Sequence, residues 1–206
     1  MNLVYNNAGI GDVLLINFDT VSDNFKFERR GDVAQITDEQ GTIVGYNIFA
    51  ASEKLSLTHT GVYLDDMITG KAAEAVVVAA GFDSFPEQAY EPNFVVGEVV
   101  SCEAHPKSDH LSICQVNIGT RVEQIVCGAA NVALGQKVPV AVVGAIMPSG
   151  LQVVPAQLRT VDSNGMICAM RELNLPNAPQ EKGIMILPMD APVGKGFFAY
   201  YNEVNA

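Results

Sequence analysis

The chain has 206 residues, enough for one large domain or two small ones. Hydrophobic residues make up 49% of it and charged residues 17%, which excludes an intrinsically disordered chain. The longest nearly apolar run, Val138–Met147, contains Pro139 and Gly144 and is half the length of about 20 residues that a membrane helix needs. The segment before Phe18 has no Lys or Arg, so it lacks the basic start of a secretory signal. We therefore expect a cytoplasmic protein with no membrane partner.

The charge is acidic and unevenly distributed. The formal net charge is −11, which repels the phosphates of a nucleic acid. Residues 1–90 hold 5 Lys and Arg against 13 Asp and Glu, whereas residues 91–206 hold 7 against 10. This difference indicates two domains with different roles, and it lowers the expected affinity of the whole chain for RNA.

The cysteine pattern favours core packing over a metal or redox site. The four cysteines are separated by 12, 13 and 41 positions, so none forms a C-x-x-C pair, and all lie in apolar segments: Cys102, Cys114, Cys127 and Cys168. The alternative is a zinc site built from these residues and the three histidines. We expect neither a metal nor a cofactor.

The first part of the chain predicts a small α+β domain over residues 1–85, whose role its sequence leaves open. Strands are expected at Asp12–Phe18, Val33–Thr37 and Ile43–Phe49, and the last two flank a turn at Asp38–Gly41. Apolar residues recur at three- and four-residue spacing over Asp65–Ala80, which predicts a helix that ends at Gly81. Pro86 and Pro92 then mark residues 86–93 as a linker.

The remainder, residues 94–206, predicts a β-barrel. Short strands rich in Val and Ile alternate with turn residues, and they are expected at Phe94–Cys102, Leu111–Ile118, Val122–Cys127, Lys137–Val143, Met166–Met170 and Ile184–Leu187. The first five of these strands, with no long helix, are typical of an OB-fold barrel, and Ile184–Leu187 is a possible last strand. This pattern also fits a β-sandwich. The predicted fold class of the whole chain is thus α+β, mostly β.

Four ordered blocks of sequence carry a family resemblance. They are His105–Leu111, Ile125–Val132, Lys137–Ala141 and Leu158–Cys168. Together they resemble the tRNA-binding domain of the bacterial phenylalanyl-tRNA synthetase β-subunit and of the endothelial-monocyte-activating-polypeptide type. A free-standing chain with an unrelated domain in front most resembles the bacterial YtpR family. The resemblance covers about residues 93–175 and implies an OB fold that binds tRNA without catalysis.

The predicted barrel places two of these blocks where an OB fold binds its ligand. OB ligands lie across strands 2 and 3, between the loop joining strands 1 and 2 and the loop joining strands 4 and 5. The first loop is His105–His110 and the second is Gly144–Gly165. Lys107 and Arg159 each put a permanent positive charge in one of these loops, so we expect them to contact phosphate. The alternative for each is a solvated surface charge.

Four more residues are candidate RNA contacts, each with a structural alternative. His110 could stack on a base or donate to phosphate, while His105 could equally hydrogen-bond within its own loop. Asn131 and Ser163 can donate to phosphate or read a base edge, but both residue types are also common in turns. His110 stands where the family usually has Lys or Arg, and Thr160 stands where it usually has glycine.

The predicted barrel lacks aromatic side chains. Residues 95–196 contain no Phe, Tyr or Trp, although proteins that bind single strands usually stack bases on such side chains. We therefore expect it to recognise the shape and backbone of a folded RNA, which favours tRNA over unstructured RNA or DNA. The aromatic tail Phe197–Tyr201 is expected to pack against a domain or, alternatively, to form a homodimer contact.

Three hypotheses follow for function. The leading one is a non-catalytic tRNA-binding protein, with an aminoacyl-tRNA synthetase as a further candidate partner. The alternative is a protein-interaction module whose OB barrel no longer binds RNA, and the net charge of −11 supports it. An enzyme in residues 1–85 is the weakest, since that stretch has one histidine, His59, and no cysteine.

Overall fold

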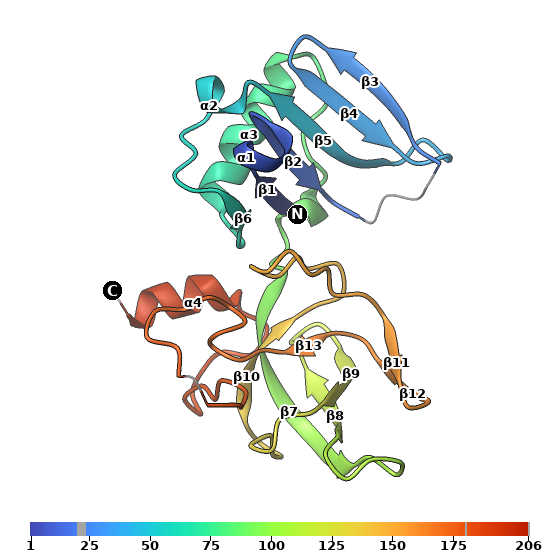
Figure 1. Cartoon of the computed structure of the whole chain (residues 1–206), viewed down its shortest axis with the longest axis vertical. Helices are drawn as coiled ribbons and strands as arrows, with labels where there is room; N and C mark the ends of the chain where they lie inside the picture. Colours follow the sequence, from blue (N-terminus) through green and yellow to red (C-terminus); the bar gives the residue numbers. More distant parts are fainter. Residues whose placement is uncertain (20–23, 180, 206) are drawn as a thin grey trace. The chain divides into compact units, whose positions relative to one another are not determined.

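The computed structural model describes residues 1–19, 24–179 and 181–205. They form two compact units, Met1–Glu91 and Pro92–Ala206, and each is treated by itself below (Figure 1). Within the described residues, no helix is long and apolar enough to cross a membrane.

The first unit is an antiparallel sheet packed against one main helix. Its six strands lie in the order β3-β4-β5-β2-β1-β6. They are β1 (Asn2–Tyr5), β2 (Val13–Asn17), β3 (Lys26–Arg30), β4 (Val33–Thr37), β5 (Ile43–Phe49) and β6 (Gly61–Tyr63). The helices are α1 (Asn7–Ile10), α2 (Ala51–Lys54) and α3 (Met67–Ala79), with a short 3-10 helix, η1 (Glu87–Tyr90), at the end of the unit.

Local signals set the ends of α3. The Asp66 carboxylate accepts from the backbone N–H groups of Ile68 and Thr69, both at 3.0 Å, which caps two free donors of the first turn. Gly81 follows the helix with a φ of 87°, the left-handed conformation that ends helices. The helix packs against the sheet through Ala73 and Val77, both fully buried. The predicted helix and the predicted strands around the 38–41 turn are confirmed.

Three strands and the role of one segment differ from the sequence-based expectation. Strands β1, β3 and β6 were not expected, because β1 and β6 are short and β3 reads Lys-Phe-Glu-Arg-Arg, a charged edge strand exposed at every residue. Residues 87–90, expected to belong to a linker, form η1 and pack on the first unit. Ala89 is buried, and its carbonyl accepts from the N-terminal ammonium of Met1 at 2.5 Å.

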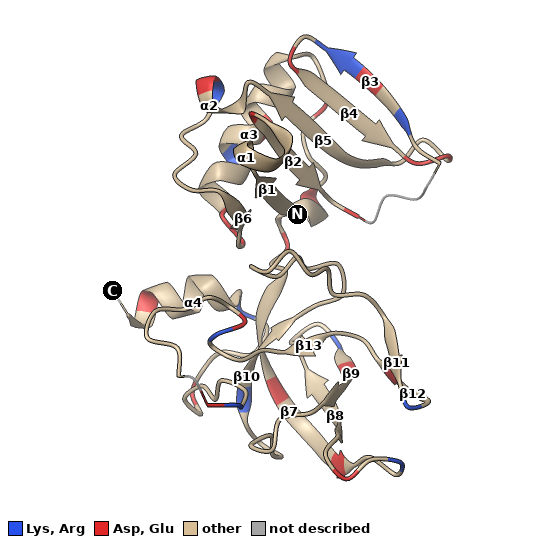
Figure 2. Ribbon diagram, viewed as in Figure 1, with Lys and Arg blue, Asp and Glu red and all other residues tan. Residues whose placement is uncertain are grey.

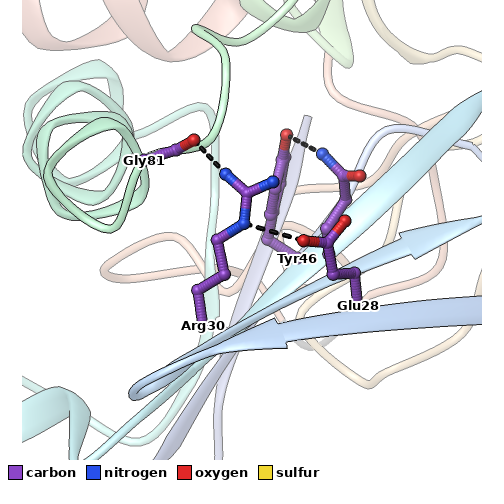
Figure 3. A network of polar contacts seen from close by, with 5 residues as sticks. Glu28, Arg30, Tyr46 and Gly81 are labelled. Atoms are coloured by element: carbon purple, nitrogen blue, oxygen red, sulfur yellow. Dashed lines mark hydrogen bonds and ion pairs between the residues drawn. The ribbon is translucent and has the colours of Figure 1, made fainter.

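Arg30 fixes the edge of this sheet to the end of α3 (Figure 3). Its Nε donates to a carboxylate oxygen of Glu28 at 2.8 Å, and its Nη1 donates to the carbonyl of Gly81. The guanidinium carbon also lies 4.2 Å from the centre of the Phe82 ring. Beside it, Gln35 donates to the hydroxyl of the fully buried Tyr46 at 2.9 Å. Both hydrogen bonds of Arg30 and its ring contact therefore link elements of the first unit.

The second unit is a nearly closed five-stranded barrel. Its main sheet has the order β13-β10-β7-β8-β9, and a separate two-stranded hairpin, β11–β12, lies in the connection between β10 and β13. The strands are β7 (Phe94–Ala104), β8 (Ser112–Asn117), β9 (Val122–Cys127), β10 (Lys137–Ala141), β11 (Ala156–Leu158), β12 (Val161–Ser163) and β13 (Met166–Ile167). The long strand β7 is shared by both halves, since it pairs with β10 and with β8 and carries a register shift between Val99 and Ser101.

The barrel closes where the chain returns to β9 after the hairpin. The N–H of Asn164 donates to the carbonyl of Gln124 at 2.8 Å. Gly165 has a φ of 136°, and a Cβ there would lie 3.1 Å from the carbonyl oxygen of Ala141 and 3.2 Å from Ile125 Cδ1. Only glycine lets the two edges approach this closely.

Two expectations about the end of the chain meet different outcomes. The strand predicted at Ile184–Leu187 is wrong, because the segment makes only a single bridge, between Leu187 and Lys137. The N–H of Met185 donates to the carbonyl of Cys168 and Ile184 bonds to a side chain, so successive residues bond to different partners and no ladder forms. The aromatic tail forms helix α4 (Phe197–Val204), which packs on β7, with Phe198 and Phe94 in edge-to-face contact at 5.2 Å.

The barrel interior is filled by small aliphatic side chains and thiols. Cys114 and Cys168 are fully buried, Cys127 is buried, and Cys102 is half-buried. All four are free thiols, and burial raises the pKa of Cys114 and of Cys168 to about 12. The thiols of Cys114 and Cys168 therefore stay protonated near neutral pH and act as small hydrophobic residues.

Candidate nucleic-acid interface

The loop between β7 and β8 is closed by its own backbone. His105 N–H donates to the carbonyl of Leu111 at 2.9 Å, and Ser108 N–H donates to the carbonyl of His105 at 3.1 Å. Lys107 N–H donates to His105 Nδ1 at 3.0 Å. The imidazole therefore fixes the backbone on which the Lys107 side chain is mounted.

The β11–β12 hairpin faces this loop, and its turn is strained. Leu158 pairs with Val161, so the connection consists of Arg159 and Thr160. Their φ values are 46° and 78°, both in the left-handed region, where a two-residue hairpin turn favours residues such as Asn and Gly. A β-branched residue is rare at such a φ and costs about 1–3 kcal/mol. The family's glycine at the position of Thr160 would relieve this strain.

His105 joins the loop to the hairpin. Its side chain is 3% exposed, and its Nε2 lies 3.2 Å from the carbonyl oxygen of Leu158. Because Nδ1 already accepts from Lys107, Nε2 carries the proton and donates to that carbonyl. Both ring nitrogens of His105 thus form hydrogen bonds within the protein. This buried residue supports the candidate interface and has no free ring nitrogen with which to contact a ligand.

Lys107 and Arg159 lie side by side across the two segments. Arg159 Nη1 donates to the carbonyl of Lys107 at 3.1 Å, and Lys107 Nζ donates to the Thr160 hydroxyl at 3.1 Å. Both side chains are exposed, and Figure 2 shows their positive charge at the hairpin tip and in the β7–β8 loop. The sequence did not single out Thr160 as the partner of Lys107. We call the loop 105–111 and the hairpin β11–β12 together the rim.

The candidate His110 is exposed in the rim, next to the carboxylate of Asp109. The side chain of His110 is 76% exposed, and its Nε2 lies 3.5 Å from a carboxylate oxygen of Asp109. A protonated His110 would be partly neutralised by this carboxylate, so it contributes less positive charge than a lysine would.

Asn131 and Ser163 are used by the fold. The Asn131 amide donates to the carbonyl of Ile184 and accepts from the N–H of the same residue, both at 3.0 Å, so its side chain replaces a strand neighbour. Ser163 is 4% exposed, and its hydroxyl accepts from Val126 N–H at 3.0 Å where the hairpin meets β9. Ser163 thus holds the hairpin of the rim onto β9, while Asn131 holds the segment at Ile184, which lies outside the rim.

The described residues contain no cluster of three or more His, Cys, Asp or Glu that could hold a metal ion. The thiols closest to one another, Cys102 and Cys114, have their sulfurs 3.8 Å apart inside the barrel. The rim itself offers two cations, one exposed imidazole and the Thr160 hydroxyl, beside two exposed carboxylates, Asp109 and Asp162. The cations are suited to holding an anion, and the carboxylates weaken that attraction.

Both parts of the chain match known protein families. Residues 94–196 match the family model described as “Putative tRNA binding domain”, and residues 20–84 match a domain of unknown function. The chain is 46% identical over 200 residues to the “Putative tRNA-binding protein YtpR” of Bacillus subtilis, covering 96% of this chain and 99% of that protein. The chain belongs to the YtpR family.

The chain is also similar to part of a larger enzyme subunit. The chain is 45% identical over 142 residues to the phenylalanine–tRNA ligase β subunit of Oleidesulfovibrio alaskensis. The match covers 69% of this chain but only 17% of the ligase subunit. A solved MetRS-related protein of Pyrococcus horikoshii has 22% identity and a TM-score of 0.36, with 49% of this chain and 84% of that one covered. The resemblance that the four sequence blocks predicted is confirmed.

Proposed function

We propose that this YtpR-family protein is a non-catalytic, cytoplasmic tRNA-binding protein whose rim holds the sugar-phosphate backbone of the folded RNA. The observation that carries the proposal is the pairing of Lys107 and Arg159. They are 52 positions apart in the chain, yet each hydrogen-bonds to the other's segment with its charge exposed. Two adjacent cations on pre-arranged loops suit phosphate recognition.

The six candidate residues take two roles in this proposal. Lys107 and Arg159 contact phosphate, and His110 adds a hydrogen-bond donor at the same edge. His105 and Ser163 position the rim, because their side chains bond to its hairpin or hold the hairpin to β9. Asn131 stabilises the barrel through Ile184, outside the rim.

A folded RNA suits this surface better than a flexible single strand. The barrel has no aromatic side chain between Val95 and Gly196, so stacking platforms for successive bases are missing from its sequence. Recognition through backbone and shape then applies, as it does for structured RNA. The net charge of −11 opposes binding, so we expect micromolar affinity for one chain. A homodimer, or association with an aminoacyl-tRNA synthetase, would raise the effective affinity.

Binding of tRNA to a double variant tests the rim. Lys107→Ala combined with Arg159→Ala should weaken tRNA binding roughly tenfold or more at about 50 mM salt, measured by fluorescence anisotropy. Because two phosphate contacts are lost, the slope of log affinity against log salt should fall by about 2. Arg121→Ala is the matched control, since it removes one exposed cation that is already paired with Glu123. A double variant that binds like this control would refute the rim.

The alternative, a protein-interaction module, is favoured by one observation. Thirteen of the 23 carboxylates lie in residues 1–90, which gives the first unit an acidic surface suited to a basic protein partner. Capture of partners from lysate with and without ribonuclease separates the two functions. Partners that persist after ribonuclease treatment, in a protein that does not bind purified tRNA, would support the module.

A further inference from the structure

The cations of the second unit fall into two groups. Three of its seven Lys and Arg residues form ion pairs, namely Arg121 with Glu123, Lys137 with Glu98 and Lys195 with Glu203. Within the part of the chain that the structure describes, the other four have no carboxylate oxygen within 4.0 Å, and they are Lys107, Arg159, Arg171 and Lys182. The first two form the rim, and the other two line one cavity.

This cavity lies between the end of β9 and the segment that follows β13. It has a volume of about 260 Å³, and its walls include Cys127, Gly128, Met166, Arg171, Glu172 and Lys182. Two of the four family sequence blocks, Ile125–Val132 and Leu158–Cys168, contribute to these walls. The cavity therefore combines an apolar surface with two unpaired cations and one carboxylate.

The cavity is adjacent to the rim. Ser112, at the end of the rim loop, pairs with Cys127 in the β8–β9 ladder. A Cβ built on the next residue, Gly128, would lie 3.4 Å from Leu111 Cδ2 in the same loop. The cavity therefore borders the Leu111 end of the rim loop.

A second hollow continues the first. It has a volume of about 500 Å³ and shares Met166, Arg171 and Glu172 with the first cavity, while its other walls include Met147 and Ser149. Arg171 thus borders both hollows. Its only hydrogen bond to a described residue is a long one, 3.5 Å from Nη1 to the carbonyl of Glu181. Most of its five N–H donors are therefore not used by the described residues of the protein.

We propose that the first cavity binds one unpaired nucleotide of the RNA, with the base inside and its phosphate at Arg171 and Lys182. The proposal rests on the tRNA binding proposed above and adds a second contact to it. The volume corresponds to roughly nine waters, which suits a purine base of about ten non-hydrogen atoms. Met166 supplies a thioether, which makes favourable contacts with flat rings where no aromatic residue is present.

Glu172 sets the orientation of this nucleotide. Its Oε2 accepts from Ala169 N–H at 2.7 Å, which fixes the carboxylate in the cavity wall. A carboxylate repels phosphate and accepts N–H donors, so the base edge enters and the phosphate stays with the two cations. Adenine, cytosine and guanine carry an amino group that offers two donors, whereas uracil has one ring N–H. The site therefore prefers a base with an amino group.

The charges are tested by Arg171→Ala combined with Lys182→Ala in the full chain. Both residues are exposed, so the fold should be retained. We expect tRNA affinity to fall roughly fivefold at about 50 mM salt and the salt slope to fall by about 1, since one phosphate is lost. Binding equal to that of Arg121→Ala would overturn the proposal.

The base site is tested by filling the cavity without changing charge. Ala129 lines it and is half-buried, so Ala129→Leu places extra methyl groups inside. Binding of tRNA should weaken about threefold with an unchanged salt slope. A folded variant, checked by its melting temperature, that binds as well as the wild type would show that no base enters.

A measurement on the wild-type protein keeps the proposal testable even if a variant misfolds. With amide NMR, millimolar AMP should shift the resonances of Gly128, Ala129 and Gly183, and UMP or inorganic phosphate should shift them less. Equal shifts with phosphate alone, or none with AMP, would overturn the nucleotide site. If AMP binds here but tRNA does not bind the protein, the proposed function fails while the cavity site stands. If the rim variants lose tRNA binding and the cavity variants keep it, the proposed function stands and the cavity site fails.

Discussion

Two hairpins with two-residue turns, one in each unit, use arginine in opposite ways. In the first unit, β3 and β4 are joined by Gly31 and Asp32, and the preceding Arg30 contacts a carboxylate, a carbonyl and an aromatic ring. In the second unit, Arg159 itself occupies the turn and makes one hydrogen bond, to the carbonyl of Lys107. The first arginine stabilises its fold, whereas the second is left available to a ligand.

The turns differ in strain as well as in charge. Gly31 has a φ of 57°, which glycine adopts freely, while Arg159 and Thr160 adopt φ values of 46° and 78° without that freedom. The strained turn is held by His105 and by the contact of Thr160 with Lys107. Backbone strain of this kind persists only where the surroundings impose it, and it is often associated with function.

The largest effect is expected from removing the anchor of the strained hairpin. His105→Ala leaves the carbonyl of Leu158 and the N–H of Lys107 without their partner and opens a cavity, so it should destabilise the second unit by about 2–4 kcal/mol. Hydrogen exchange of the barrel amides measures this loss. His110→Ala, a change at an exposed imidazole, is the control and should leave stability unaltered. If both variants were equally stable, His105 would not be the anchor.

A smaller loss is expected from the anchor of the relaxed hairpin. Arg30→Ala should destabilise the first unit by about 1 kcal/mol, because the guanidinium is 43% exposed and its ion pair is weakened by water. Its tRNA affinity should match that of the wild type. Lys71→Ala, which removes an exposed cation of the same unit, provides the control in urea denaturation. A loss of tRNA binding in Arg30→Ala would show that this hairpin also contacts RNA.

Adding glycine to the strained turn and removing it from the relaxed turn should change the stability of the two units in opposite directions. Thr160→Gly relieves the positive φ and should stabilise the second unit by about 1 kcal/mol, whereas Gly31→Ala should destabilise the first by a similar amount. Thermal unfolding compares the two. Thr160→Gly also removes the hydroxyl that holds Lys107, so tRNA binding should weaken slightly despite the gain. A less stable Thr160→Gly variant would mean that this hydroxyl contributes more than the strain costs.

The smallest effect concerns pH. Hydrogen bonds from the backbone N–H and the hydroxyl of Ser52, at 2.9 and 2.8 Å, lower the pKa of Asp12 below its usual value. The stabilisation is therefore present above about pH 4, the range of the unfolded carboxyl, and is lost as the pH falls through the lower folded pKa. Asp12→Asn should be less stable than the wild type at pH 7, and the gap should close on acidification. A gap that is constant with pH would exclude this cause.

Local patterns predicted much of the fold but not the contacts of the site. The helix ending at Gly81, the strands around the 38–41 turn and the first four barrel strands follow from spacing and turn residues within short windows. The hairpin β11–β12 was missed inside a predicted loop, since its turn lacks the Asn-Gly signal and its strands have three residues each. Apolar composition predicts a strand at residues 184–187, but it does not reveal that successive residues there bond to different partners.

Patterns in the sequence are enough to predict the two-part organisation, the barrel class, the loops that form the rim and the family. Which polar residues hold the fold, and which cations lack an ion-pair partner among the described residues, depends on the folded chain. His105 bonds to Leu158, Lys107 to Thr160 and Asn131 to Ile184, and each of these pairs spans 53 positions. The sequence likewise could not show that Arg121 is paired while Arg171 and Lys182 line a cavity. Hydrogen bonds and ion pairs depend on distances of a few ångströms, which chain folding sets between segments with no pattern in common.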